Sequence, residues 1–164
     1  VDSTMRGNIG AEISGLMDAL EIRHTLLVPA LPKYGRTTIN GKVFVNGVLL
    51  EETEFGNDPK NPVKESFIPK IISCQTDKKT GVIIYDYILA GRKTLIEKLQ
   101  HHLNAGIEII IFDVKEEKDI DLIASVISEM KIKVLFAGCS GLAEYVSKYL
   151  KIKKVSCYET LPFL

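Results

Sequence analysis

The first residues of the chain, VDSTMRGNIG, concentrate side chains that could bind a small polar ligand. Asp2 is an acceptor-only carboxylate, Ser3 and Thr4 carry hydroxyls, and Arg6 presents a planar guanidinium suited to a carboxylate or a phosphate. A helix with apolar periodicity follows at once, and helix N-termini favour anions. These residues predict a site for a molecule with an anionic end and hydroxyls. On the residues alone, an internal ion pair between Asp2 and Arg6 is an equally good interpretation.

Two loops later in the chain also carry groups that bind anions or hydroxyls. PALPKYGRTT follows the first predicted strand and contains Lys33, Arg36, Thr37 and Thr38. The acidic stretch FDVKEEKD follows a predicted strand at 107–111. Open α/β sheets bind ligands at the carboxyl ends of their strands, so we expect both loops near the opening segment. For PALPKYGRTT, a solvated loop is the alternative that the pattern alone favours.

AGCSG, residues 137–141, is a small-residue turn that leads from a predicted strand into a helix. Gly138 and Ser140 are its candidates for anion binding, through backbone N–H groups at the helix N-terminus and the Ser140 hydroxyl. A tight turn whose glycines only relieve steric crowding is the slightly favoured alternative. The segment is not a GxSxG turn, because position 142 is Leu, and no GKS/T follows to make a Walker A loop.

The composition is ordinary for a soluble globular protein and argues against several classes of function. The 164 residues are 46% apolar and 26% charged, which suits one domain with its own core. Lys+Arg and Asp+Glu both number 21, so the net charge of zero lacks the basic excess of a nucleic-acid-binding protein. No apolar run reaches the length of a membrane span, and no signal peptide is visible.

The cysteines and histidines predict neither a disulfide framework nor a metal site. The three cysteines are Cys74, Cys139 and Cys157. Their odd number and wide spacing suit a reducing cytoplasm, and we expect all three to be buried or half-buried thiols. His24, His101 and His102 show no metal-ligand spacing with the cysteines. We therefore expect a cytoplasmic protein with no metal site in this chain.

From position 81 onward, the hydrophobic pattern alternates strand with helix, which predicts a parallel sheet with helices on its faces. Asn46-Gly47 lies between two β-rich runs and predicts a hairpin with a type I′ turn. The fold class is therefore a layered, parallel-sheet α/β domain with an inserted β-hairpin. A doubly wound sheet usually has more strands, so we expect the domain to be incomplete at its N-terminus.

The individual elements follow from periodicity, turn residues and capping signals. The predicted helices are 8–20, 67–73, 93–106, 117–132 and 140–150. The predicted strands are 24–28, 81–88, 107–114 and 133–138, with the hairpin at 42–50. Between them, 31–42 is predicted as a polar loop and 51–66 as an ordered flap. Ser66 is expected to cap the helix at 67–73.

Four segments together resemble the four-carbon acid sugar kinase family. DSTMRGNIGAE is similar to the family's K-x-DSTLRGN-x-G-x-E segment, and AGCSGLAE to its GSAGLAE turn. IFDVKEEKDIDLIA resembles the strand and acidic loop that precede a helix in the family. The longest match is PALPKYGRTTINGKVFVNGVLLEETEFGNDPKNPV, which resembles PAFPxxGRxTxxGxxxVxGxPLxxTxFxxDPxxPV almost position for position. Met5, Leu49 and Cys139 depart from the family pattern.

The resemblance implies an ATP-dependent kinase that phosphorylates the terminal hydroxyl of a four-carbon sugar acid such as threonate, erythronate or 3-oxo-tetronate. It implies an N-terminal domain that binds the acid and a C-terminal domain that mainly binds ATP and Mg²⁺. Residues 1–150 would be the later part of the first domain, and 151–164 a tail or linker. Such a fragment alone would be inactive. A non-catalytic sugar-acid-binding or regulatory module without the ATP domain is the alternative.

The matching positions carry hypothetical roles. Asp2 and Arg36 are the candidates for catalysis, Arg36 by stabilising charge on the transferring phosphoryl group. Arg6 and the helix N-terminus would bind the carboxylate of the substrate, and Asp2 and Ser3 its hydroxyls. The other substrate-binding candidates are Thr4, Gly35, Thr37, Gly138 and Ser140. The expected partners are a small-molecule sugar acid and ATP, without nucleic acid or membrane, and an exposed sheet edge would favour a homo-oligomer.

Overall fold

A computed structural model describes residues 1–150, and its centre is a sheet of four parallel strands. The strands are β1 (Thr25–Val28), β5 (Thr80–Ile83), β6 (Ile109–Phe112) and β7 (Leu135–Gly138). They lie in the order β5-β6-β1-β7, so β6 and β1 are interior. All pairings are parallel, which places the carboxyl ends at one edge of the sheet. This arrangement confirms the predicted parallel α/β sheet.

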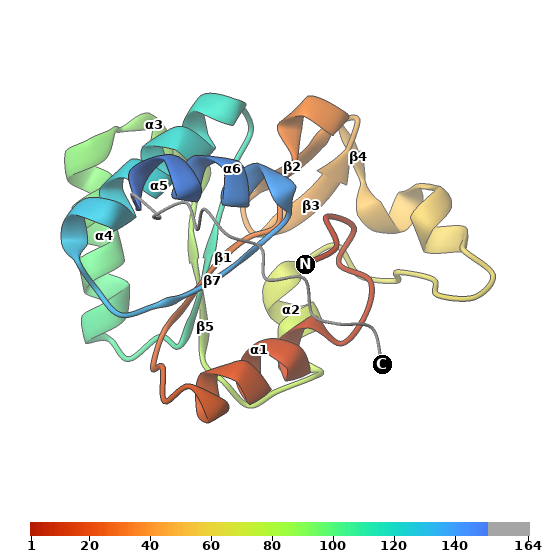
Figure 1. Cartoon of the computed structure of the whole chain (residues 1–164). Helices are drawn as coiled ribbons and strands as arrows, with labels where there is room; N and C mark the ends of the chain where they lie inside the picture. The colour runs from red at the N-terminus through yellow and green to blue at the C-terminus, as the bar shows by residue number, and fades with distance from the viewer. Residues whose placement is uncertain (151–164) are drawn as a thin grey trace, which may run out of the picture.

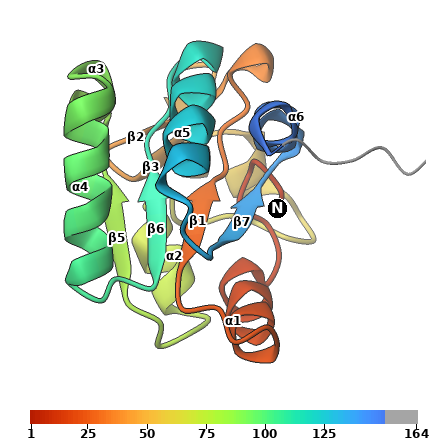
Figure 2. The ribbon, with the colours of Figure 1, turned by 60° about the vertical axis from the view of Figure 1, so that its left-hand side comes forward.

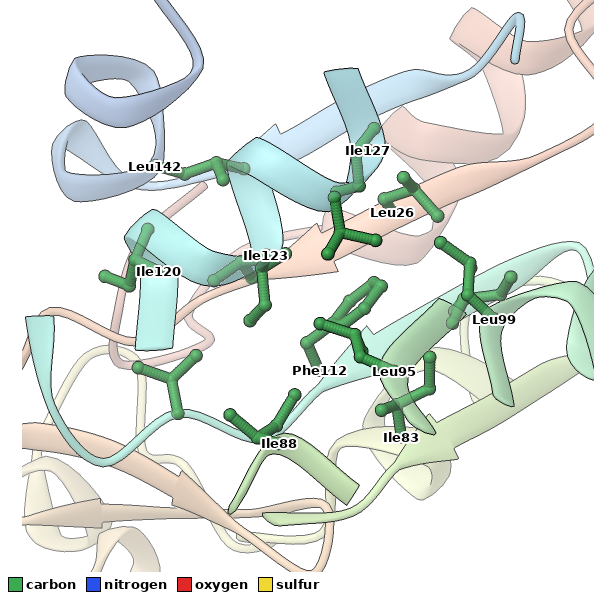
Figure 3. Close-up of a cluster of buried hydrophobic side chains, with 14 of the residues drawn as sticks. Leu26, Ile83, Ile88, Leu95, Leu99, Phe112, Ile120, Ile123, Ile127 and Leu142 are labelled. Atoms are coloured by element: carbon green, nitrogen blue, oxygen red, sulfur yellow. The ribbon is translucent and has the colours of Figure 1, made fainter. Parts of the chain in front are cut away.

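The interior strands are buried on both faces, as their continuous apolar runs predict. Every residue of β1 and β6 is buried. Side chains alternate between the faces, so Leu26 and Phe112 join one core cluster while Leu27 and Ile111 join the other. Figure 3 shows the first cluster, in which leucine and isoleucine side chains of the helices surround Phe112. Burial of this kind stabilises a fold by about 25 cal/mol per Å² of apolar surface.

Helices cover both faces of this sheet (Figure 1 and Figure 2). Their bounds are Ile9–Ala19 (α1), Ile68–Ser73 (α2), Tyr85–Leu89 (α3), Arg92–Asn104 (α4), Glu117–Met130 (α5) and Ser140–Tyr149 (α6). Helices α3 to α6 pack on the face of Phe112, and α1 and α2 pack on the opposite face. Among residues 1–150, no helix combines the length and apolarity that a membrane crossing requires.

A second, antiparallel sheet follows β1 and lies on the side of α1 and α2. Its strands are β2 (Arg36–Ile39), β3 (Lys42–Val45) and β4 (Val48–Leu49). Asn46 and Gly47 have φ values of 51° and 82° between β3 and β4. Positive φ at both central residues is the mark of a type I′ turn, so the predicted hairpin is confirmed.

The prediction of a polar loop at 31–42 is wrong, because β2 lies within it. Pro32–Tyr34 form the 3-10 turn η1, and β2 then pairs with β3. Asn40 and Gly41 also have positive φ, 52° and 70°, so a second Asn-Gly pair makes the turn between these strands. The strand residues of β2 are mostly polar, and a pattern based on hydrophobicity therefore does not detect them.

Residues 51–66 form an ordered flap, as the sequence predicts. Its 3-10 turns are η2 (Leu50–Glu52) and η3 (Glu54–Asn57). The backbone N–H of Glu51 donates to the Ser66 hydroxyl at 3.1 Å, which ties the two ends of the flap together. The prediction that Ser66 caps α2 is wrong, because this hydroxyl serves the flap and the helix has no side-chain cap.

A buried carboxylate joins the two sheets just after β6. Asp113 accepts hydrogen bonds from the backbone N–H groups of Asn40 at 2.5 Å, Gly41 at 2.9 Å and Tyr85 at 3.0 Å. The residue is fully buried. Burial raises the pKa of Asp113, although the three N–H donors act in the opposite direction. One side chain thus holds the β2–β3 turn against the parallel sheet.

The predicted strand at 81–88 is too long. β5 ends at Ile83, and α3 begins at Tyr85. The cause is a tertiary contact: the N–H of Tyr85 donates to the Asp113 carboxylate instead of continuing a ladder with β6. Apolar residues fill the first turn of a short helix as readily as the end of a strand, so periodicity does not separate the two.

Asp113→Asn is expected to destabilise the protein by about 1–3 kcal/mol, because its amide NH₂ would face backbone N–H donors and leave at least one of them unpaired. Urea unfolding at neutral pH measures the change. Asp77→Asn, at an exposed carboxylate, is the control and should stay within about 0.5 kcal/mol of the parent. Equal unfolding midpoints for the two variants would show that the Asp113 carboxylate does not hold the sheets together.

Candidate functional site

Three side chains of the opening segment form one hydrogen-bonded network. Oδ1 of Asp2 accepts from the Thr4 backbone N–H at 2.8 Å and from the Thr4 hydroxyl at 2.7 Å. Nε of Arg6 donates to Oδ2 of Asp2 at 3.1 Å and to the Thr4 hydroxyl at 3.0 Å. Thr4 is buried, whereas the side chains of Arg6 and Asp2 are 37% and 34% exposed. Ser3 is half-buried and takes no part in these bonds.

The backbone of this segment is bent to bring the three side chains together. The N–H of Met5 donates to the carbonyl of Asp2 at 3.0 Å, which closes a turn. Met5 is buried with a φ of 55°, a left-handed conformation that costs a non-glycine residue roughly 1–2 kcal/mol. Gly7 follows with a φ of 100°, and Asn8 is the N-cap of α1. Strain that the surrounding packing holds in place is typical of functional sites.

The surroundings of Asp2 favour its ionised form. Burial alone would raise the pKa of Asp2, but the Thr4 N–H, the Thr4 hydroxyl and the Arg6 guanidinium together lower it below its usual value.

The internal ion pair between Asp2 and Arg6, which the sequence left as an alternative, is present. It uses only Nε of Arg6, and Nη1 makes a longer contact of 3.9 Å with Asp58. The ion pair thus orients the guanidinium and leaves Nη2 on its outer edge for a ligand.

A cavity of about 480 Å³ opens beside Arg6 and the start of α1. Arg6 and Asn8 line it from the opening segment, and Lys60 and Lys64 line it from the flap. Glu65 is the one carboxylate in the lining, so the cavity is positively charged overall. Its volume lies in the range of small-molecule sites. The two lysines are new candidates, and the DPKNPVK stretch was the sequence signal that could have indicated them.

Gln75 fixes the wall of this cavity at the start of α1. Its Oε1 accepts from the N–H of Gly10 at 2.7 Å, and its Nε2 donates to the carbonyl of Gly7 at 3.1 Å. A Cβ at position 10 would lie 2.9 Å from the Cβ of Gln75, so the glycine permits this close approach. The contact joins residues far apart in the sequence, and no local pattern predicts it.

Arg36 meets the opening segment through an aromatic ring of the flap. Its guanidinium carbon lies 5.8 Å from the centroid of the Phe55 ring, and that of Arg6 lies 5.3 Å from the same centroid. Both distances are within the range of cation–π interactions. Nη1 of Arg36 donates to the carbonyl of Tyr34 at 3.0 Å, while Nε is buried without a partner among residues 1–150. The fold therefore gathers both candidate arginines around Phe55.

Thr37 and Gly35 do not join this cluster. Side chains alternate along β2, so Thr37 faces away from Arg36 and lines a separate cavity of about 410 Å³ with Gly35 and Lys115. Gly35 has a φ of 70°, and a Cβ there would collide with the side chain of Asn46. The hairpin geometry therefore requires glycine at position 35, independently of any role in ligand binding.

Lys33 and Thr38 are engaged within the fold. The backbone N–H of Lys33 donates to Glu117 at 3.0 Å, and its Nζ pairs with Glu144 at 3.5 Å. Thr38 is fully buried and exchanges backbone hydrogen bonds of 2.8 and 3.0 Å with Val114. The anion contact considered for these two residues would require Lys33 to leave its ion pair.

The turn after β7 lies beside the opening segment. The Val1 nitrogen donates to the carbonyl of Gly138 at 3.1 Å. A Cβ at position 138 would lie 2.6 Å from Leu142 and 2.7 Å from the carbonyl of Val28, so the glycine relieves crowding, as the steric interpretation holds. Ser140 begins α6 and is exposed. Its hydroxyl is therefore accessible at the same edge of the sheet as the opening segment.

The described part of the chain contains no group of three or more His, Cys, Asp or Glu residues that could hold a metal ion.

Cys139 is half-buried, as expected. The expectation of burial is wrong for Cys74, which is exposed because it follows the last turn of α2 at the rim of the cavity beside Arg6. Cys157 and the predicted tail at 151–164 lie outside the described residues.

The chain matches the family model described as "Sugar-binding N-terminal domain" over residues 1–146. D-threonate kinase of Salmonella typhimurium is 40% identical over 145 residues, which cover 87% of this chain and 33% of that protein. The 3-oxo-tetronate kinase of Brucella melitensis is 35% identical over 147 residues, 90% of this chain and 33% of that protein.

A crystal structure of Haemophilus influenzae protein HI1011, assigned to DUF1537, is similar with a TM-score of 0.81 and 28% identity. The match covers 92% of this chain and 37% of that protein. The chain thus spans about a third of the length of the curated relatives it matches, 33% for each of the two kinases. The opening segment, the hairpin and the flap all lie inside the matched region. The chain therefore belongs to the four-carbon acid sugar kinase family, through its sugar-binding N-terminal domain.

Proposed function

We propose that this chain is the sugar-acid-binding part of an ATP-dependent kinase that phosphorylates the terminal hydroxyl of a four-carbon sugar acid. Residues 1–150 would form the later part of the acid-binding domain, and residues 151–164 would lead toward an ATP-binding domain. The relatives named D-threonate kinase and 3-oxo-tetronate kinase support this assignment. The observation that carries it is the positively charged cavity at the opening segment, within the matched sugar-binding domain.

The geometry suggests how the acid is held. The carboxylate would bind the outer edge of Arg6 beside the start of α1, where a guanidinium and a helix N-terminus both favour a negative charge. Lys60 and Lys64 would add positive charge from the flap. The hydroxyls would contact Ser3 and the free lone pairs of Asp2, since Thr4 is buried and already bonded. Gly138 and Ser140 would contribute from the turn after β7.

Catalysis would rest on position and electrostatics. In the transfer, the terminal hydroxyl oxygen of the acid would form a bond to the γ-phosphorus, the bond from that phosphorus to the ADP oxygen would break with its electron pair left on ADP, and the hydroxyl proton would pass to solvent water. Phosphoryl transfer needs little help from a strong base, and the lowered pKa of Asp2 makes it a weak one. Asp2 would instead orient the hydroxyls and Arg6. Arg36 would stabilise negative charge on the transferring phosphoryl group.

ATP and Mg²⁺ would be bound mainly by the part of the full-length protein that this chain does not span. Within residues 1–150, no acidic cluster offers a ligand set for Mg²⁺, and the turn at 137–141 lacks the lysine of a Walker A loop. When bound, the metal ion would neutralise charge on the β- and γ-phosphates. The residues of this chain would hold the acid and exclude water around it.

A non-catalytic sugar-acid-binding or regulatory module is the second candidate. It would use the same cavity and the same Arg6 network, but it would release no ADP.

We further infer a cytoplasmic location, because the unpaired thiols of Cys74 and Cys139 suit a reducing compartment. Strands β5 and β7 are the edges of the parallel sheet and offer surfaces for self-association into a homo-oligomer.

The first test is ADP release by the full-length protein with ATP, Mg²⁺ and a panel of threonate, erythronate and 3-oxo-tetronate. We expect turnover with at least one acid. Arg6→Ala should lower kcat/KM for that acid by about 10- to 150-fold, the loss of charge-assisted hydrogen bonds worth about 1.5–3 kcal/mol. Arg23→Ala, an exposed arginine at the amino ends of the strands, is the control. Binding of an acid without ADP release would favour the non-catalytic module.

Arg36→Lys tests the role of Arg36 in charge stabilisation. Lysine keeps the charge but loses the fork of donors, so we expect kcat to fall by about 100-fold or more. The KM for the acid should change less than kcat, because the interaction forms mainly in the transition state. Steady-state kinetics of the full-length protein measure both. A rise in KM with an unchanged kcat would place Arg36 in ground-state binding instead.

Asp2→Asn tests the role of an ionised carboxylate at the opening segment. Because the folded-state pKa of Asp2 is lowered, its contribution to stability is present above the unfolded value, about 4, and is lost as the pH falls through the folded value. The variant is neutral at every pH. We expect it to bind the acid more weakly and unfold more easily at pH 7, with the stability difference narrowing under strongly acidic conditions. A difference that is constant from pH 7 to pH 2 would contradict this role.

A further inference from the structure

We propose that Phe55 is a positioning residue that holds Arg6 and Arg36 as a matched pair, one guanidinium for each end of the four-carbon acid. Arg6 would take the carboxylate end, and Arg36 the end that receives the phosphoryl group. This inference rests on the proposed function and gives the flap at 51–66 a role in positioning the substrate-binding groups.

The separation of the two guanidinium groups fits such a ligand. With 5.3 Å and 5.8 Å to the same ring centroid, the two guanidinium carbons are at most about 11 Å apart. An extended four-carbon chain spans roughly 4 Å between its end carbons at ordinary bond lengths. A hydrogen-bonded contact of about 3 Å at each end extends this to about 10 Å. This reach is close to the upper limit on the separation of the two guanidinium carbons, so a four-carbon acid has about the length that contact with both arginines requires.

The backbone that carries the Phe55 ring is held on both sides. The N–H of Phe55 donates to the Thr53 hydroxyl at 3.3 Å, and its carbonyl accepts from the N–H of Val63 at 3.0 Å. At the next position, a Cβ on Gly56 would collide with the carbonyl of Glu51, so the chain is packed there without room for a side chain. A ring held in this way can fix the two arginines before the ligand binds, which is the requirement for a preorganised site.

The arginines keep donors that a bound anion can use. Arg6 gives Nε to Asp2 and Thr4, and Arg36 gives Nη1 to the carbonyl of Tyr34. Within residues 1–150, no hydrogen bond uses Nη2 of either arginine, and Nη1 of Arg6 makes only the 3.9 Å contact with Asp58. Asp2 and Asp58 already lie beside Arg6, whereas no carboxylate of residues 1–150 pairs with Arg36, so an anion in contact with both guanidinium groups would give Arg36 a counter-charge. The Nη2 donors of both arginines are therefore left for a ligand.

Direct binding of the acid to the full-length protein tests the proposal, measured by calorimetry without ATP. Phe55→Leu keeps an apolar side chain but removes the aromatic face, so we expect binding to weaken by roughly 5- to 30-fold, two cation–π contacts of about 0.5–1 kcal/mol each. Phe55→Tyr keeps the ring and should bind within about threefold of the parent. Phe44→Leu is the matched control, since Phe44 is equally half-buried but lines the cavity on the opposite face of the hairpin.

Kinetics separate positioning from a merely structural role. Phe55→Leu should raise KM through Arg6 and lower kcat through Arg36, whereas general destabilisation would lower the melting temperature and leave both constants unchanged. In the Phe55→Leu background, Arg36→Lys should reduce kcat by much less than it does in the parent, because Arg36 is already misplaced. Equal effects of Arg36→Lys in the two backgrounds, or unaltered binding by Phe55→Leu, would overturn the proposal.

A spectroscopic readout keeps this inference apart from the proposed function. In ¹⁵N-arginine NMR spectra, the Nε–Hε signals of Arg6 and Arg36 should carry ring-current shifts that Phe55→Leu removes and Phe44→Leu leaves in place. If the parent binds no acid of the panel, the proposed function fails, and these shifts alone decide whether Phe55 positions the pair. Signals that are the same with and without the Phe55 ring would exclude the positioning role.

Discussion

The buried carboxylate of Asp113 is the constraint on which the arrangement of this molecule depends. It comes from the end of an interior strand, and it accepts backbone N–H groups from the β2–β3 turn and from the start of α3. A buried carboxylate is tolerable only when donors surround it, so the three segments are held in one relative position. The hairpin that carries Arg36 is therefore fixed to the sheet whose carboxyl-terminal edge faces the opening segment.

Three segments of the chain meet at this edge of the sheet. The opening segment brings the Asp2–Arg6 ion pair, β2 brings Arg36, and the flap brings the Phe55 ring within cation–π distance of both guanidinium groups. Each segment is held by its own contacts. The opening segment has the left-handed turn at Met5, Arg36 lies on β2, which pairs with β3, and the N–H of Phe55 donates to the Thr53 hydroxyl. Function in such a site depends on groups that are fixed before the ligand arrives.

The match to the sugar-binding N-terminal domain and the two kinase relatives give this geometry a chemical context. Under the proposed function, the positively charged cavity with its ordered guanidinium would bind the sugar acid, and the second arginine would lie at the end at which charge develops in phosphoryl transfer. The same cavity would serve a binding module equally well. This chain covers 33% of the length of each of the two kinases. Whether the protein is a kinase or a binding module depends on residues that correspond to the rest of their length.

The sequence by itself determined the local features. Apolar runs specified the buried strands at Leu26 and Ile110, and Asn46-Gly47 specified a type I′ turn, because these signals lie within a few neighbouring residues. The density of polar groups at Asp2 and Arg6 indicated a site for the same reason. The second Asn-Gly pair, at Asn40, carried the same turn signal, but the polar residues of β2 concealed its strand.

Only the tertiary structure decided which residues act together. It placed Phe55 beside both arginines, joined Gln75 to the start of α1, and turned Thr37 away from Arg36 to the opposite face of the hairpin. It also showed that Arg6 can pair with Asp2 through Nε while its Nη2 makes no hydrogen bond among residues 1–150. These relations join segments far apart in the chain, and their geometry follows from packing and hydrogen bonding across the whole domain, which no local pattern encodes.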